Sequence, residues 1–139
     1  MTLEALKNLA KIGKIKAEPM NQAEIDRMLN MARKRLQDAN VTELSQEGRF
    51  SSTYNAIHVA ALAALRWHGY RSENRYIVFQ SLDHTLGWPA SKWRVLDAAH
   101  QKRNLAEYEG FLEIEESTIK ELKQLANELI ADVEKLIRA

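Results

Sequence analysis

Apolar residues recur every three or four positions along nearly the whole of this 139-residue chain. This is the spacing that lets an α-helix bury one face, and it excludes most sheet-based folds because strands alternate with a period of two. The last run begins near Ser117, and its apolar face comprises Ile119, Leu122, Leu125, Ala126, Leu129, Val133, Leu136 and Ile137. The pattern predicts an all-α protein, a single up-and-down helical bundle of about five to six helices with short connections.

Capping residues divide the pattern into separate helices. Asn21, with Glu24 three residues later, has the spacing of a capping box, and Ser45 is placed to cap the next helix. The glycines at 13, 69, 87 and 110 each follow a periodic segment, where a helix commonly ends. Residues 75–86 are predicted to form one helix, although 76–79 also fit a lone strand. We expect residues 1–18 to be an N-terminal helical extension and residues 20–139 to be the bundle.

The composition narrows the classes of protein. The chain has no cysteine, so a disulfide framework and thiolate metal sites are excluded. The longest strongly apolar segment, residues 56–65, is too short to span a membrane, and the N-terminus lacks the pattern of a signal peptide. The four histidines of the chain form no H-x-x-x-H pair, the spacing of a metal site, and the sequence has no glycine-rich phosphate-binding loop. We therefore expect a cytoplasmic protein without cofactor, metal ion or membrane association.

The charge is unevenly distributed, although the net charge is only +1. Between positions 49 and 103 there are eight basic and three acidic residues, a balance of +5. From position 111 to the end there are four basic and seven acidic residues, a balance of −3. A basic middle region can bind a polyanion, although solvated helix faces would give the same count.

The predicted helix from Ser91 to Gly110 has two distinct flanks. A small-residue apolar flank, suited to packing in the bundle, comprises Val95, Ala98, Ala99, Leu105 and Ala106. The opposite flank begins apolar and becomes polar, and comprises Trp93, Leu96, His100, Arg103, Asn104 and Glu107, with Tyr108 at its margin. We expect the second flank to be partly covered, either by the bundle or by a second copy of the chain. In a purely structural interpretation, Arg103 pairs with Glu107 one turn away, while Asn104 and Tyr108 satisfy backbone groups.

Three segments also carry a family resemblance: residues 24–39, residues 48–71 with the motif RF-x-x-x-YNA, and residues 95–110 with the motif RN-x-x-x-Y. Read in this order, they resemble the HEPN superfamily of helical-bundle proteins over about residues 20–138. The resemblance implies a homodimer in which a signature arginine, a following polar residue and a histidine from two subunits meet in a cleft. In many toxins of that superfamily, this cleft cuts RNA without a metal ion.

Carried over by position, Arg103 matches the signature arginine and Asn104 matches the polar residue. Tyr108 stands where the superfamily has its histidine. A phenol with an ordinary pKa near 10 is a poor proton donor or acceptor at neutral pH, so the resemblance leaves open whether the chain is an endoribonuclease. His100, one turn before Arg103, is a candidate to replace the histidine. Glu107 and Lys102 are candidate binding residues, with Glu107 and Tyr108 holding the arginine.

Two functions follow from these observations. The first is a HEPN-like homodimer that binds or cleaves RNA, as a component of a toxin–antitoxin pair. The second is a non-catalytic helical interaction module with a protein partner such as a minimal nucleotidyltransferase.

Overall fold

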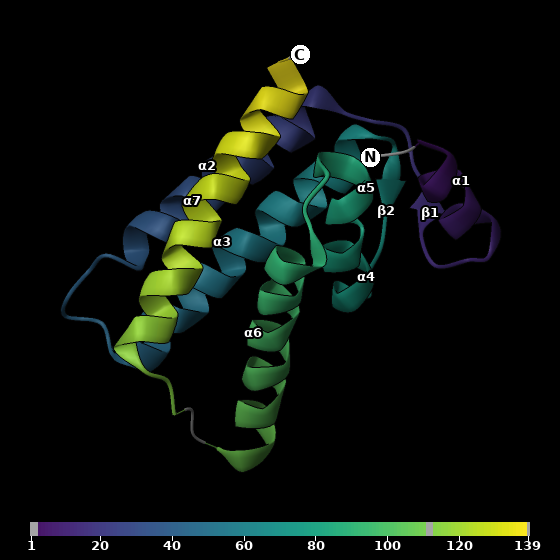
Figure 1. Cartoon of the computed structure of the whole chain (residues 1–139). Helices are drawn as coiled ribbons and strands as arrows, with labels where there is room; N and C mark the ends of the chain where they lie inside the picture. The colour runs from purple at the N-terminus through teal and green to yellow at the C-terminus, as the bar shows by residue number, and fades with distance from the viewer. Residues whose placement is uncertain (1–2, 111–112, 139) are drawn as a thin grey trace.

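The computed structural model describes residues 3–110 and 113–138 and is an all-α bundle, as predicted (Figure 1). The described elements are α1 (Leu3–Lys11), β1 (Lys16–Ala17), α2 (Gln22–Asp38), α3 (Gln46–Trp67), β2 (Tyr70–Arg71), α4 (Arg75–Gln80), α5 (Leu82–Leu86), α6 (Ala90–Glu109) and α7 (Glu116–Arg138). In Figure 1 the long helices α2, α3, α6 and α7 alternate in direction, which is the up-and-down arrangement.

Helix α3 lies at the centre of the bundle, packed against α2 and α7. Its inner faces carry fully buried small residues, at positions 56, 60, 63 and 64, that let the neighbouring helices approach closely. Larger side chains of α3, including Phe50 and Ile57, are fully buried in the core between these helices. Among the described helices, none is long and apolar enough to cross a membrane.

The helix boundaries agree with the sequence signals. The side chain of Asn21 accepts a hydrogen bond from the Glu24 amide at 3.1 Å, and Ser45 accepts one from the Gly48 amide at 3.0 Å. Gly87 and Gly110 follow α5 and α6 with φ angles of 70° and 78°, in the left-handed region that other residues rarely adopt. Gly110 ends α6, the helix that carries His100, Arg103 and Asn104.

Two local features differ from the sequence prediction. The single helix predicted for residues 75–86 is two helices, α4 and α5, which meet at Ser81, whose carbonyl accepts from the amides of both His84 and Thr85. Residues 76–79 are helical, so the lone-strand alternative is wrong. A short antiparallel pairing of β1 with β2 was not predicted, since two residues per strand leave no periodic signal.

A buried arginine connects this β-pair to the bundle. Arg66, in the last turn of α3, is only 2% exposed. Its guanidinium donates to the Glu24 carboxylate at 2.6 Å, and to the backbone carbonyls of Glu18 at 3.0 Å and Pro19 at 2.8 Å. Because the charge is paired and its hydrogens are used, Arg66 can be buried while it holds the 18–24 segment against α3.

One flank of α6 is covered by the bundle, as the sequence predicted, and the other is not packed as predicted. The flank of Trp93, Leu96 and His100 faces the bundle, where α4 and α3 cover it. On the predicted packing flank only Ala99 is buried, while Ala98 is exposed and Leu105 is 56% exposed. The prediction for the first flank was therefore wrong. The small apolar residues of that flank resembled a surface for close helix packing. The larger Trp93 and Leu96 bury more apolar area when they face inward, so the opposite flank packs against the bundle.

Candidate functional site

A hydrogen-bonded cluster joins α3, α4 and α6 at the polar part of the inward flank. Its centre is the fully buried Tyr54 of α3. Arg75, the first residue of α4, donates to the Tyr54 hydroxyl at 2.9 Å, and Nδ1 of His100 on α6 lies 3.1 Å from the same oxygen. Asn104, one turn along α6, donates from its amide nitrogen to Nε2 of His100 at 3.2 Å.

These contacts define the proton positions on His100. An amide nitrogen can only donate, so Nε2 is the acceptor and a neutral imidazole carries its proton on Nδ1. That proton is donated to the Tyr54 oxygen, which also accepts from Arg75. His100 therefore presents a basic nitrogen toward Asn104, away from the buried phenol.

Two guanidinium groups lie over the aromatic ring of Tyr54. Those of Arg75 and Arg103 are 5.5 Å and 5.4 Å from the ring centroid, within the range of cation–π attraction. Arg103 has a long contact of 4.0 Å with the Glu107 carboxylate, and Arg75 has no ion pair among the residues that the structure describes. The positive charge of the cluster is therefore only weakly neutralised by direct pairing.

Burial and these charges shift the pKa values of the cluster. Burial raises the pKa of Tyr54, opposed by the hydrogen bond from Arg75 and by the charges of Arg75 and Arg103. Burial lowers the pKa of His100, and the two guanidiniums lower it further, whereas the nearby carboxylate of Asp97 raises it. At neutral pH the phenol is thus protonated and the imidazole neutral, so His100 can accept a proton.

A second histidine faces the cluster from α3. His58 lies one turn after Tyr54, with its ring 6.2 Å from Phe79 and nearly perpendicular to it. Burial, followed by the charges of Arg75, His100 and Arg103, lowers the pKa of His58 to about 4. His58 is therefore neutral at physiological pH.

A cleft of about 360 Å³ continues from this cluster between the first turns of α3 and the last turns of α6. It is lined by Glu47, Ser51, Arg103, Ala106, Glu107 and Gly110. Arg103 thus contacts the Tyr54 ring and lines the open cleft at the same time. An anion in the cleft could reach its guanidinium.

The structure brings together some of the residues predicted from the sequence. Arg103, Asn104 and His100 belong to one cluster, and Glu107 lines its cleft. Asn104 forms a hydrogen bond with the His100 side chain. The purely structural interpretation of the sequence had expected Asn104 to bond to backbone groups instead. Tyr108 is 92% exposed and Lys102 is also exposed, so both lie outside the cluster.

No sequence pattern predicted Tyr54, Arg75 or His58 as site residues. Tyr54 is the tyrosine of RF-x-x-x-YNA, so the motif contained a signal that could have identified it. Arg75 and His58 stand in no motif, and only the packing of α4 and α3 against α6 reveals them.

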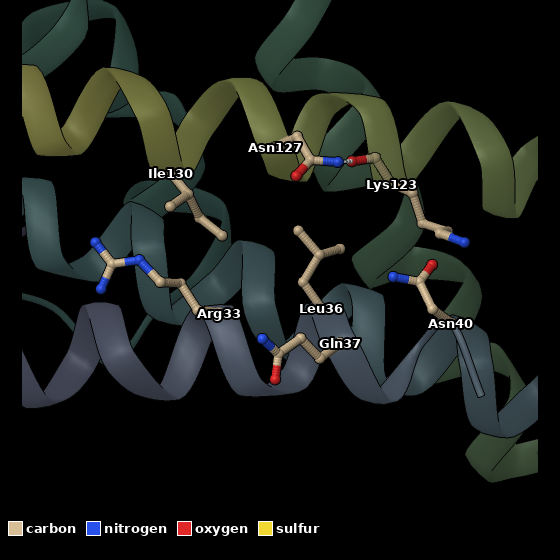
Figure 2. Close-up of a pocket in the computed structure, with 7 residues that line it drawn as sticks. All are labelled: Arg33, Leu36, Gln37, Asn40, Lys123, Asn127 and Ile130. Atoms are coloured by element: carbon tan, nitrogen blue, oxygen red, sulfur yellow. Dashed lines mark hydrogen bonds between the residues drawn. The ribbon is translucent and has the colours of Figure 1, made fainter.

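A second hollow, of about 340 Å³, lies between α2 and α7 (Figure 2). Leu36 and Ile130 point toward each other across it. Of its two cations, Arg33 is bound to Glu134 and Asn30, whereas Lys123 has no ion pair among the residues that the structure describes. The groove lacks a histidine, so it offers less acid–base chemistry near neutral pH than the Tyr54 cluster.

Within residues 3–110 and 113–138, no three side chains of the types His, Asp and Glu are grouped so that they could hold a metal ion. Comparisons of the chain with protein-family models, with curated proteins and with solved structures found no match. The structure therefore defines the class: an all-α helical bundle with a cationic histidine–tyrosine cluster.

Proposed function

We propose that this chain is a HEPN-like homodimer that binds RNA at the Tyr54 cluster and cleaves it without a metal ion. The observation that carries the proposal is the convergence of Arg75, Arg103 and His100 on one buried phenol, beside an open cleft. Guanidinium groups bind phosphate, and a neutral imidazole can take a proton at neutral pH. His100 thus takes the role for which Tyr108 is chemically unsuited.

In the proposed reaction, Nε2 of His100 removes the proton of a ribose 2′-hydroxyl after the RNA displaces Asn104 from that nitrogen. The 2′-oxygen then forms a bond to phosphorus while the bond to the 5′-oxygen breaks, and the leaving oxygen takes a proton from water. The products are a 2′,3′-cyclic phosphate and a 5′-hydroxyl. Arg103 stabilises the charge that develops on the phosphate oxygens, and Tyr54 acts as a positioning residue.

The exposed flank of α6 supports the homodimer in this proposal. Leu105 and Tyr108 lie on the outer side of the helix, and burying them against a second copy would remove apolar and aromatic surface from water. Light scattering should give twice the mass of one chain. A monomer at micromolar concentrations would contradict this part of the proposal.

The test of catalysis is an RNA cleavage assay in excess EDTA. We expect wild-type cleavage to survive EDTA, and Arg103→Ala and His100→Gln to reduce it by at least about a hundredfold, as is typical for loss of an electrostatic or acid–base group. Tyr108→Phe should retain activity, because its hydroxyl lies outside the cluster. Arg35→Ala on α2 is the matched control for loss of an exposed arginine. Cleavage by a folded wild-type dimer no faster than by Arg103→Ala would overturn the enzyme assignment.

The alternative is a non-catalytic interaction module with a protein partner such as a minimal nucleotidyltransferase. One observation favours it: the side chains of Tyr54, His100 and Asn104 hydrogen-bond to one another, as in a structural network. In this alternative, the exposed Tyr108 belongs to the partner-binding surface. The same assay separates the two functions, since the module would show no cleavage in any variant.

A further inference from the structure

An exposed aromatic side chain lies next to the cationic cluster. Tyr76 follows Arg75 in the first turn of α4 and is 41% exposed. The edge of its ring meets Trp93 of α6, with ring centroids 6.0 Å apart and an interplanar angle of 77°. On α6 the guanidinium of Arg94 covers the Trp93 ring at 5.4 Å. Tyr76 thus contacts a buried tryptophan whose ring also carries Arg94, while part of the Tyr76 side chain is exposed.

The aromatic pair and the cluster follow one another along α6. Trp93 and His100 are seven residues apart on the same flank, a separation of about 10 Å at 1.5 Å per residue. Arg103 and the cleft that ends at Gly110 come next along the helix. Tyr76 lies at the Trp93 end of this path, and Arg75, its neighbour in the chain, reaches the Tyr54 oxygen in the middle.

We propose that Tyr76 is a stacking platform for an unpaired base, so that the site takes single-stranded and not double-stranded RNA. The inference rests on the proposed function, because it assumes that the arginines of the Tyr54 cluster bind the phosphates. Proteins that bind single strands combine a cationic path along the backbone with aromatic rings on which bases stack. A duplex hides the faces of its bases, so Tyr76 would gain nothing from it.

The charges around Tyr76 agree with this assignment. Arg94 is exposed and has no ion pair in the described part of the chain, so it can approach a phosphate beside the stacked base. By contrast, Lys92, two residues earlier, is bound to Glu128 of α7 and lies over Trp88. Two cations without an ion pair in the described part of the chain therefore adjoin the Tyr76–Trp93 pair: Arg75 precedes Tyr76 in the chain, and Arg94 lies over the Trp93 ring.

The test compares the binding of a fluorescein-labelled 2′-O-methyl oligouridine, which cannot be cleaved through its 2′-oxygen, with that of a 2′-O-methyl duplex of the same length, in EDTA and at one salt concentration. Tyr76→Phe keeps the ring and should bind within about twofold of wild type. Tyr76→Leu keeps apolar cover on Trp93 without an aromatic face and should bind the single strand at least about fivefold more weakly. Tyr70→Leu removes another partly exposed tyrosine, on β2 and outside this path, and is the matched control, with wild-type affinity expected. Thermal unfolding of each variant verifies that Trp93 remains packed.

Failure of this inference is distinguishable from failure of the proposed function. If Arg103→Ala weakens binding while Tyr76→Leu binds as wild type does, Tyr76 is not a stacking platform, although the cluster still binds RNA. If the duplex binds as tightly as the single strand, the inference is also overturned. If the wild-type protein binds neither RNA, the proposed function and this inference both fail.

Discussion

The hydroxyl of Tyr54 and Nδ1 of His100 lie 3.1 Å apart, and the two rings are nearly parallel, with centroids separated by 6.2 Å. The phenol is fully buried on α3, whereas the imidazole is half-buried on α6. Because Arg75 of α4 donates to the same oxygen, one atom joins three helices that are distant in the sequence. Tyr54 is too deeply buried to contact a substrate, so its part is to orient the imidazole and the guanidinium.

Removal of this hydroxyl should destabilise the protein. Tyr54→Phe keeps the ring and its edge contact with Phe79, but it leaves donors of Arg75 and His100 without their shared acceptor. We expect the free energy of unfolding to fall by about 1–3 kcal/mol, the usual cost of leaving partly buried polar groups unpaired. Urea denaturation measures the change, with Tyr108→Phe as the exposed control. Equal stability of Tyr54→Phe and wild type would show that the oxygen does not join the helices.

The extent to which the site could be predicted depends on distance along the chain. The caps at Asn21 and Ser45 were predicted because each signal acts within three residues. The grouping of His100 with Asn104 was also predicted, since helical spacing alone places them on one face. Tyr54 and Arg75 lie 46 and 25 residues from His100, and no local rule specifies that α3 and α4 present them to the same atom.

The buried Arg66 should be among the most sensitive positions in the chain. Arg66→Met approximates the volume of the side chain but leaves the Glu24 carboxylate and the carbonyls of Glu18 and Pro19 without their donors. Breaking a buried pair from one side typically costs about 3–5 kcal/mol, and we expect a loss near the lower end because Glu24 is partly exposed. The loss is measured by urea denaturation.

Arg35→Met is the matched control for this measurement, because Arg35 pairs with Asp38 on the exposed surface of α2. Surface pairs contribute about 0–1 kcal/mol, so the control should unfold at nearly the wild-type urea concentration. Similar losses in both variants would contradict the assignment of Arg66 as the anchor of the 18–24 segment.

His58 should make the stability depend on pH. Its pKa is lowered from 6.5 to about 4 in the folded protein, so on acidification the unfolded chain takes up a proton before the folded protein does. The contribution of His58 to the free energy of unfolding is therefore fully present above about pH 6.5, and it is lost as the pH falls toward 4. We expect about 2–3 kcal/mol to be lost between pH 7 and about pH 4.5. Urea denaturation across this range measures the slope.

His58→Gln is the variant that isolates this effect. It should lose less stability than wild type over the same pH range, although some dependence remains because burial also lowers the pKa values of His68 and His100. Titration of the His58 ring protons by NMR gives the pKa directly. A midpoint near 6.5 would show that the imidazole is solvated, and it would remove the basis for the slope.

The orientation of α6 makes a prediction that distinguishes its two flanks. Leu96 is fully buried, whereas Leu105, nine residues later on the other flank, is mostly exposed. Leu96→Ala should lower the free energy of unfolding by about 2–5 kcal/mol, because it removes buried methyl groups and leaves a cavity. Leu105→Ala should change the stability of the monomer by less than about 0.5 kcal/mol, since alanine and leucine have similar helix propensities. Both variants replace leucine with alanine in α6, so under dilute conditions, where a dimer does not contribute, the difference in their free energies of unfolding reflects the burial of the two leucines. A large loss in Leu105→Ala that grows with protein concentration would place Leu105 in the proposed dimer interface, whereas a large loss independent of concentration would mean that α6 packs on its other flank.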